Sequence, residues 1–97
     1  MMQELKTSSQ LFGAYLHQDW ADEFGSDDEA VQAMIDLELP ETLVEASREI
    51  REMLSTQASD TELAAIMTDE VGCYFDPASK GQTYREWLGC VLKQWAR

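Results

Sequence analysis

The sequence predicts an all-α fold, a compact single-domain bundle of four to five short helices spanning residues 1–97. Three observations predict it. Apolar residues recur with the 3.6-residue period of an amphipathic helix, and no stretch alternates as a strand does. Residue pairs with capping-box spacing precede several of these patterns. The chain has 97 residues, of which 44% are hydrophobic, and this length suffices for one modest core.

The first predicted helix begins near Ser8 or Ser9, and residues 1–7 before it are expected to be flexible. Two forms of this helix agree with the sequence. It either continues unbroken to Phe24, or it breaks near residues 17–19 and restarts as a short turn. Gly25 ends it in both forms. Its broad apolar face comprises Leu11, Phe12, Tyr15, Leu16, Trp20 and Phe24.

The next two predicted helices have clear start signals. Ser26 and Glu29 cap a helix whose apolar residues are Ala30, Val31, Met34 and Ile35. The acids of its first turn are favoured by the helix dipole, which gives part of the acidic run a structural reason. A helix over about residues 40–56 follows, with Pro40 in its first turn, where the missing N–H has no penalty. One face of it carries Leu43, Ser47, Ile50, Met53 and Leu54.

Two capping boxes mark the remaining helices. Ser59 and Glu62 precede a short helix that should end near Gly72. Residues 73–82 are predicted to form an irregular loop, because Asp-Pro and Lys-Gly pairs within it favour turns. Thr83 and Glu86 begin the last helix, over about residues 83–96. Its continuous apolar stripe is Tyr84, Trp87, Leu88, Val91, Leu92 and Trp95.

The charge of the chain is strongly acidic. Seven basic residues face nineteen acidic ones, and the net charge is -12. Between Lys6 and Arg48 there is no lysine or arginine, although acids are frequent there. Nucleic acid and anionic membranes would be repelled by such a surface, whereas a basic protein would be attracted. The charge alone is also compatible with a surface that only keeps the protein in solution.

The sequence also predicts the cellular compartment of the protein. No apolar run approaches the roughly 20 residues of a membrane helix, and the first ten residues have no apolar core of a secretory signal. We therefore expect a cytoplasmic protein. Cys73 and Cys90 are the only cysteines, and in a reducing compartment we expect two free thiols in or near the core rather than a disulfide.

The sequence shows no arrangement typical of catalysis or of cofactor binding. His17 is the only histidine, and neither cysteine lies in a recognisable nucleophile motif. Close acid pairs are uninformative in a chain with this many acids, and the run at residues 27–29 lacks calcium-loop spacing. Phosphate-binding loops and clustered zinc ligands are missing. We therefore predict a binding protein with no catalytic residues, no metal and no cofactor, rather than an enzyme.

Four stretches resemble a known family. FGAYLHQDW comes first, followed by EFG with an acidic helix start, then VGCYFDP, and finally YREWLGCVLKQW. Together they resemble the CdiI immunity proteins of bacterial contact-dependent growth inhibition, over about residues 10–96. The combination of His-Gln-Asp-Trp with the terminal Glu-Trp-Leu carries most of the resemblance. The chain departs from the pattern at Leu16, where an aromatic residue is expected, and this concerns packing.

The resemblance implies a cytosolic inhibitor whose partner is the C-terminal toxin domain of a CdiA effector. Such toxins are often nucleases with basic clefts, and we expect an RNase rather than a DNase. An acidic inhibitor covering that cleft would exclude nucleic acid by occlusion and by charge. The alternative is an acidic mimic of nucleic acid, or a regulatory helical protein, that binds another basic protein. A small enzyme with a cleft around His17 is the third class, in which His17 serves activity rather than stability.

Two groups of site residues follow from this interpretation. The first group is predicted to stabilise the fold. Its motif recurs in family members that bind unrelated toxins, so these residues should be structural rather than specific for one toxin. Asp19 in particular should cap a short helix or accept a bond from His17 or Trp20. This group is Phe12, Tyr15, His17, Asp19, Trp20 and Trp87. The second group is predicted to bind the toxin: Asp22, Glu23, Asp27, Asp28, Asp36 and Glu38, followed by Glu41, Glu45 and the loop at residues 76–82.

Overall fold

The computed structural model of the chain describes residues 5–96, and this range holds helices and no strand, which confirms the predicted all-α fold. The described part has six α-helices rather than four or five, because the first predicted helix is divided in two. The elements are α1 (Lys6–Tyr15), α2 (Trp20–Glu23), α3 (Asp27–Leu37), α4 (Pro40–Ser55), α5 (Asp60–Ala65), the π-helix η1 (Ile66–Val71), the 3-10 helix η2 (Pro77–Lys80) and α6 (Tyr84–Trp95).

The start of α1 precedes the predicted one. Lys6 and Thr7 already belong to the helix, whereas residues 1–4 of the segment expected to be flexible lie outside the described residues. The first turn of α1 has no side-chain cap of its own. Glu49 of α4 supplies it instead, because its carboxylate accepts from the backbone N–H of Ser8 at 2.8 Å and of Thr7 at 3.2 Å. Glu49 is buried, so α1 and α4 are joined at this point by a carboxylate.

The break between α1 and α2 is the second of the two forms that the sequence allows. The backbone N–H of Asp19 donates to Nδ1 of His17 at 3.0 Å, and the N–H of Trp20 donates to the carbonyl of His17. These bonds replace the helical pattern, since a side chain that pairs with nearby backbone competes with the helix. The chain therefore turns at residues 16–19 before α2 begins.

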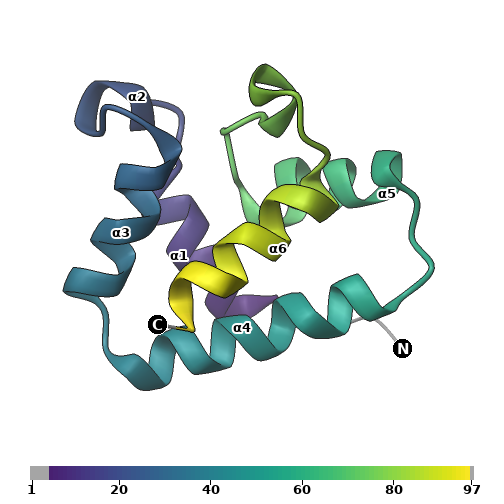
Figure 1. Cartoon of the computed structure of the whole chain (residues 1–97), viewed down its shortest axis with the longest axis horizontal. Helices are drawn as coiled ribbons and strands as arrows, with labels where there is room; N and C mark the ends of the chain where they lie inside the picture. Colours follow the sequence, from purple (N-terminus) through teal and green to yellow (C-terminus); the bar gives the residue numbers. More distant parts are fainter. Residues whose placement is uncertain (1–4, 97) are drawn as a thin grey trace.

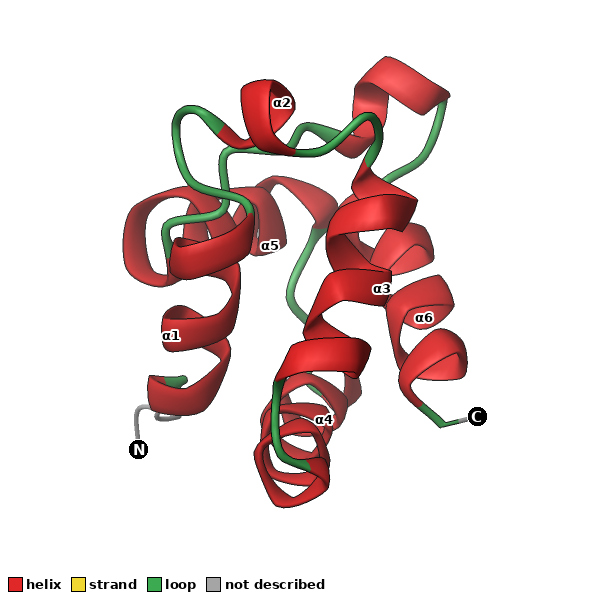
Figure 2. Ribbon diagram, turned by 90° about the vertical axis from the view of Figure 1, so that its left-hand side faces the viewer, coloured by secondary structure: helices red, strands yellow, loops and turns green. Residues whose placement is uncertain are grey.

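Helices α1 and α6 form the two sides of the core. Helix α6 crosses the middle of Figure 1 and packs against α3, α4 and α5, while α1 lies behind it against α3, α4 and η1. Figure 2 separates α1 from α6, with α4 below them. The side chain of Phe12 fills the space between, 5.8 Å from the ring of Trp87 and 5.9 Å from that of Trp95. Burial of these large rings supplies much of the hydrophobic stabilisation.

Local signals place the other helix ends. Both predicted capping boxes, of Ser59 with Glu62 and of Thr83 with Glu86, are formed. Ser26 accepts from the N–H of Glu29 as predicted, while the Glu29 carboxylate accepts from Gly25 N–H at 2.6 Å. The π-helix ends at Gly72, whose φ of 80° lies in the left-handed region that favours glycine.

The predicted irregular loop at residues 73–82 contains one short helix, η2, whose first turn is capped by Asp76. The side-chain oxygen of Asp76 accepts from Ala78 N–H at 3.0 Å. Before it, the carbonyl of Phe75 accepts a 2.7 Å bond from the Tyr84 hydroxyl, which fastens the loop to α6. The buried ring of Phe75 packs 5.0 Å from that of Trp87. The loop is therefore fixed to the core at its first half.

The two cysteines are free thiols, as predicted, but only one is in the core. Cys73 is buried, and Cys90 is exposed on the outer face of α6, where the prediction of a place in or near the core is wrong. Burial raises the pKa of the Cys73 thiol to about 12. Since the thiolate is the reactive form, Cys73 is protected both by its surroundings and by its protonation.

We therefore expect one reactive thiol in the folded protein. At neutral pH a thiol reagent should modify Cys90 within minutes and Cys73 only after unfolding, because the reagent needs an accessible thiolate. Counting modified thiols by mass spectrometry with and without denaturant checks this. The variant Cys90→Ser should show no rapid modification, and equal rates at both cysteines would contradict the burial of Cys73.

Candidate functional site

An acidic edge runs along α2, α3 and the first turns of α4. These elements form the left-hand side of the molecule in Figure 1. All six predicted toxin-binding residues lie on them or in the short link between α3 and α4, and the segment 7–47 contributes no lysine or arginine to balance them. A basic partner would be attracted to the acidic edge.

Four of the predicted residues are exposed on this edge, namely Asp22, Glu23, Asp28 and Asp36. Asp28 and Asp36 are separated by two helical turns, with Gln32 between them, so they share one face of α3. The amide of Gln32 donates to the Asp36 carboxylate at 3.1 Å, which orients it outward along the helix. These carboxylates are placed where another molecule can reach them.

Glu23 and Glu38 also lie on the edge, but each holds a bond within the chain. The Glu23 carboxylate lies 2.7 Å from Nε2 of His17, and Glu38 accepts a 2.7 Å bond from the Tyr15 hydroxyl. Burial and this bond to Glu38 raise the pKa of Tyr15 to about 12. Further along, the hydrogen bond from Arg48 lowers the pKa of Glu45. The negative charge of Glu45 is thus partly neutralised by Arg48. Asp28 has a looser ion pair, since its Oδ2 lies 4.0 Å from Lys80 Nζ.

Asp27 departs from the prediction. The residue is only 5% exposed, and its Oδ2 accepts from the indole N–H of Trp87 at 2.9 Å and from Lys80 Nζ at 3.2 Å. A carboxylate engaged in this way cannot contact a partner at the surface. The correction follows from burial: Asp27 joins the first turn of α3 to α6 and to η2, and its role is structural.

Asp27→Ala should lower the free energy of unfolding by about 3 kcal/mol, because the indole N–H and the ammonium group would both lose a buried charged acceptor. Thermal or urea unfolding measures the change. Asp28→Ala is the matched control, one position along and exposed, and should change stability by less than about 0.5 kcal/mol. Equal effects of the two variants would contradict the structural role of Asp27.

The residues predicted to hold the fold divide into core and turn positions. Phe12 and Trp87 are buried, and Tyr15 and Trp20 are half-buried. The Trp20 ring stands edge-on to Phe75 at 5.4 Å. Trp20 and Trp87 thus join α2 and α6 to the loop after η1, and Phe12 joins α1 to α6.

Both ring nitrogens of His17 form hydrogen bonds. Nδ1 accepts from Asp19 N–H, so the neutral ring carries its proton on Nε2 and donates it to Glu23. Asp19 precedes α2, but its carboxylate accepts no capping hydrogen bond, so the predicted helix cap is not formed. Asp19 contributes its backbone N–H instead, which donates to Nδ1 of His17. The arrangement is a local brace across the turn at residues 17–23.

We expect His17→Ala to destabilise the protein by about 1 kcal/mol, because both hydrogen bonds of the brace are lost at a partly exposed position. Gln18→Ala, at the exposed neighbouring position, should leave stability within about 0.5 kcal/mol of the original. Chemical denaturation of both variants checks this. An unchanged stability of His17→Ala would reopen the interpretation of His17 as a group kept for activity.

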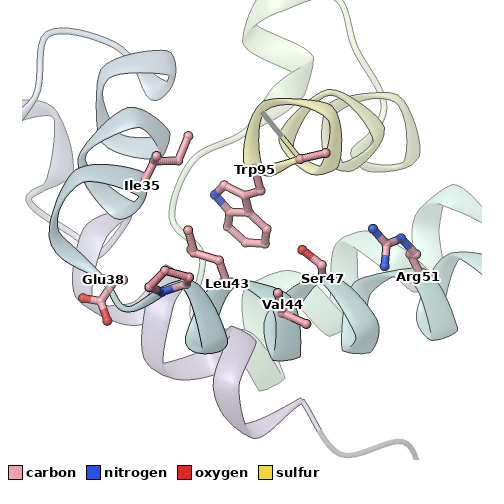
Figure 3. A pocket seen from close by; sticks show the side chains of 9 residues that line it. Ile35, Glu38, Leu43, Val44, Ser47, Arg51 and Trp95 are labelled. Carbon is pink, nitrogen blue, oxygen red and sulfur yellow. The ribbon is translucent and has the colours of Figure 1, made fainter.

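A groove of about 320 Å³ opens beside the acidic edge, where α3, α4 and α6 meet. Ile35, Leu43, Val44 and Trp95 give it apolar walls, and Figure 3 shows the Trp95 indole pointing from α6 toward α4. Glu38 and Arg51 lie at its opposite ends in this view. The groove could not be predicted from the sequence, because its walls come from three helices.

Within residues 5–96, no group of three or more histidine, cysteine or acidic side chains could hold a metal ion. None of the helices in this range is long and apolar enough to cross a membrane. The described surface has an exposed acidic edge with an apolar groove beside it, and a second hollow of about 510 Å³ lies between α5, η1 and the loop after η1. Together they define the class: a small acidic helical protein with a surface suited to binding another protein.

Comparison with known proteins gives the family. The family model described as CdiI immunity protein matches residues 4–95, so this chain belongs to the CdiI immunity protein family, as its sequence motifs indicated. A chain in the crystal structure of a CdiA-CT/CdiI complex from Y. kristensenii 33638 is 27% identical to it, with a TM-score of 0.88. That match covers 94% of this chain and 97% of the other. No curated protein is significantly similar to this chain.

Proposed function

We propose that this protein is the immunity partner of a CdiA C-terminal toxin domain and neutralises it by covering a basic active-site cleft. The toxin is a nuclease in this proposal, an RNase rather than a DNase. The protein acts as a non-enzymatic inhibitor in the cytoplasm, where the toxin would meet its substrate. The membership of the CdiI family carries the proposal.

The charge distribution supports the nature of the partner. A cleft that binds nucleic acid is lined with lysine and arginine, and those side chains would pair with an acidic edge. Asp22, Asp28 and Asp36 are exposed and able to approach such a cleft. The same charges would repel the nucleic acid substrate from the complex, so inhibition would combine occlusion with electrostatic exclusion.

Long-range attraction would act mainly on the rate of association. Opposite charges steer two proteins toward productive encounters, and salt weakens this steering because it screens charges separated by more than about 10 Å. Tight inhibition also requires slow release, which comes from desolvated contacts at the centre of the interface. We therefore propose that the acidic edge speeds association and that an apolar region lengthens the lifetime of the complex.

The test is to purify the toxin domain encoded beside this protein and to measure binding and nuclease activity together. We expect a stoichiometric complex without nuclease activity, and an association rate that falls about tenfold or more when NaCl rises from about 50 to about 500 mM. A toxin domain that neither binds nor loses activity would reject the proposal. Binding of many unrelated basic proteins instead would favour a general mimic of nucleic acid.

The acidic edge is tested with a pair of variants of equal net charge. The triple variant Asp22→Asn, Asp28→Asn, Asp36→Asn should slow association by about tenfold, because the charges facing the partner are removed. The control triple Asp60→Asn, Asp69→Asn, Glu70→Gln removes exposed acids of α5 and η1. If both triples slow association equally, only the net charge matters and the edge has no special role.

A further inference from the structure

Three large apolar side chains are exposed at the corner between α3 and α4. Leu37 is 73% exposed, Leu39 is 65% exposed and Val44 is 68% exposed. They flank the α3–α4 link within a few residues of one another, and Val44 is also part of the groove wall. Grouped large apolar residues on a soluble protein are typical of an interaction site.

The charges around this corner define what would fit there. Asp36, Glu41 and Glu45 lie on the ends of α3 and α4 that meet at the link, and Glu38 forms one end of the groove. Arg51 forms the other end. An apolar side chain with basic neighbours would fill the groove while its neighbours pair with these acids. A second copy of this chain would bring acids against acids, so a homodimer through this corner is disfavoured.

The wall of the groove also contains an unused hydrogen-bond donor. Trp95 is 8% exposed, and its indole Nε1 has no acceptor among the described residues. This is unlike Trp87, whose indole donates to Asp27. A buried donor without an acceptor destabilises the free protein, so a partner that supplies an acceptor after a small shift of the surrounding side chains would gain from it.

We propose that the α3–α4–α6 groove is the anchor site for the toxin: it takes one apolar side chain from a basic segment, and the exposed Leu37, Leu39 and Val44 cover the neighbouring surface. This inference rests on the proposed immunity function. It adds the site whose contacts would slow dissociation of the toxin. Anchors buried in a pocket near the centre of an interface contribute most of the affinity. The acidic edge beside the groove then forms the charged margin of the same interface.

Val44→Ser tests the anchor site, with Tyr74→Ser as the matched control. Both positions are large, apolar and exposed, at 68% and 61%, but Tyr74 lies far along the chain in the loop after η1. We expect Val44→Ser to weaken toxin binding about 30-fold, chiefly through faster dissociation, and Tyr74→Ser to change it less than about threefold. Val44→Arg should weaken it further, because a cation would then face the basic segment.

The indole N–H signals of the ¹⁵N-labelled protein locate the partner directly. Binding of the toxin domain should move the Trp95 signal and slow its hydrogen exchange, while the signal of Trp87 stays nearly unchanged. If the toxin binds and is inhibited, but Trp95 is unaffected and both serine variants bind normally, the anchor site is wrong and the immunity function stands. Absence of binding by the original protein would instead reject the immunity function itself.

Discussion

The hydrogen bond from the Trp87 indole to the buried Asp27 carboxylate is the contact on which the arrangement of the surface depends. Asp27 is the first residue of α3 and Trp87 lies in the first turn of α6, so a single acceptor fixes where the two helices meet. Lys80 adds a cation to the same carboxylate and brings η2 to the junction. Because the acids of α3 follow on the same helix, their position in space is set by a bond made inside the core.

Helix α3 thus contributes one face to the core and the other to the surface. The inner face of α3 buries Ala30, Val31 and Met34, while its outer face carries Asp28 and Asp36. Helices hold side chains more rigidly than loops, and a binding surface on helices loses little conformational freedom when it docks. In the proposed interface, a rigid acidic edge beside an apolar groove would combine rapid encounter with slow release.

Local features could be predicted from the sequence, and features made between distant segments could not. The capping boxes at Ser59 and Thr83 depend on residues three positions apart, and both were correct. Asp27 and Asp28 are chemically identical neighbours, and only the approach of Trp87, sixty positions later, distinguishes the buried one from the exposed one. The groove joins side chains from α3, α4 and α6, so no short pattern contains it. The family was recognisable because its motifs are themselves local strings.

The carboxylate of Glu49 that caps α1 has a consequence for the order of events during synthesis. Helix α1 is synthesised before α4, yet the acceptor for the backbone N–H of Ser8 comes from a residue 41 positions later. Until α4 has been made and has docked, the first turn of α1 lacks its cap and only water can pair with those amides. Helix α1 is therefore completed late, and it acquires its cap only after α4 has been synthesised and has docked against it.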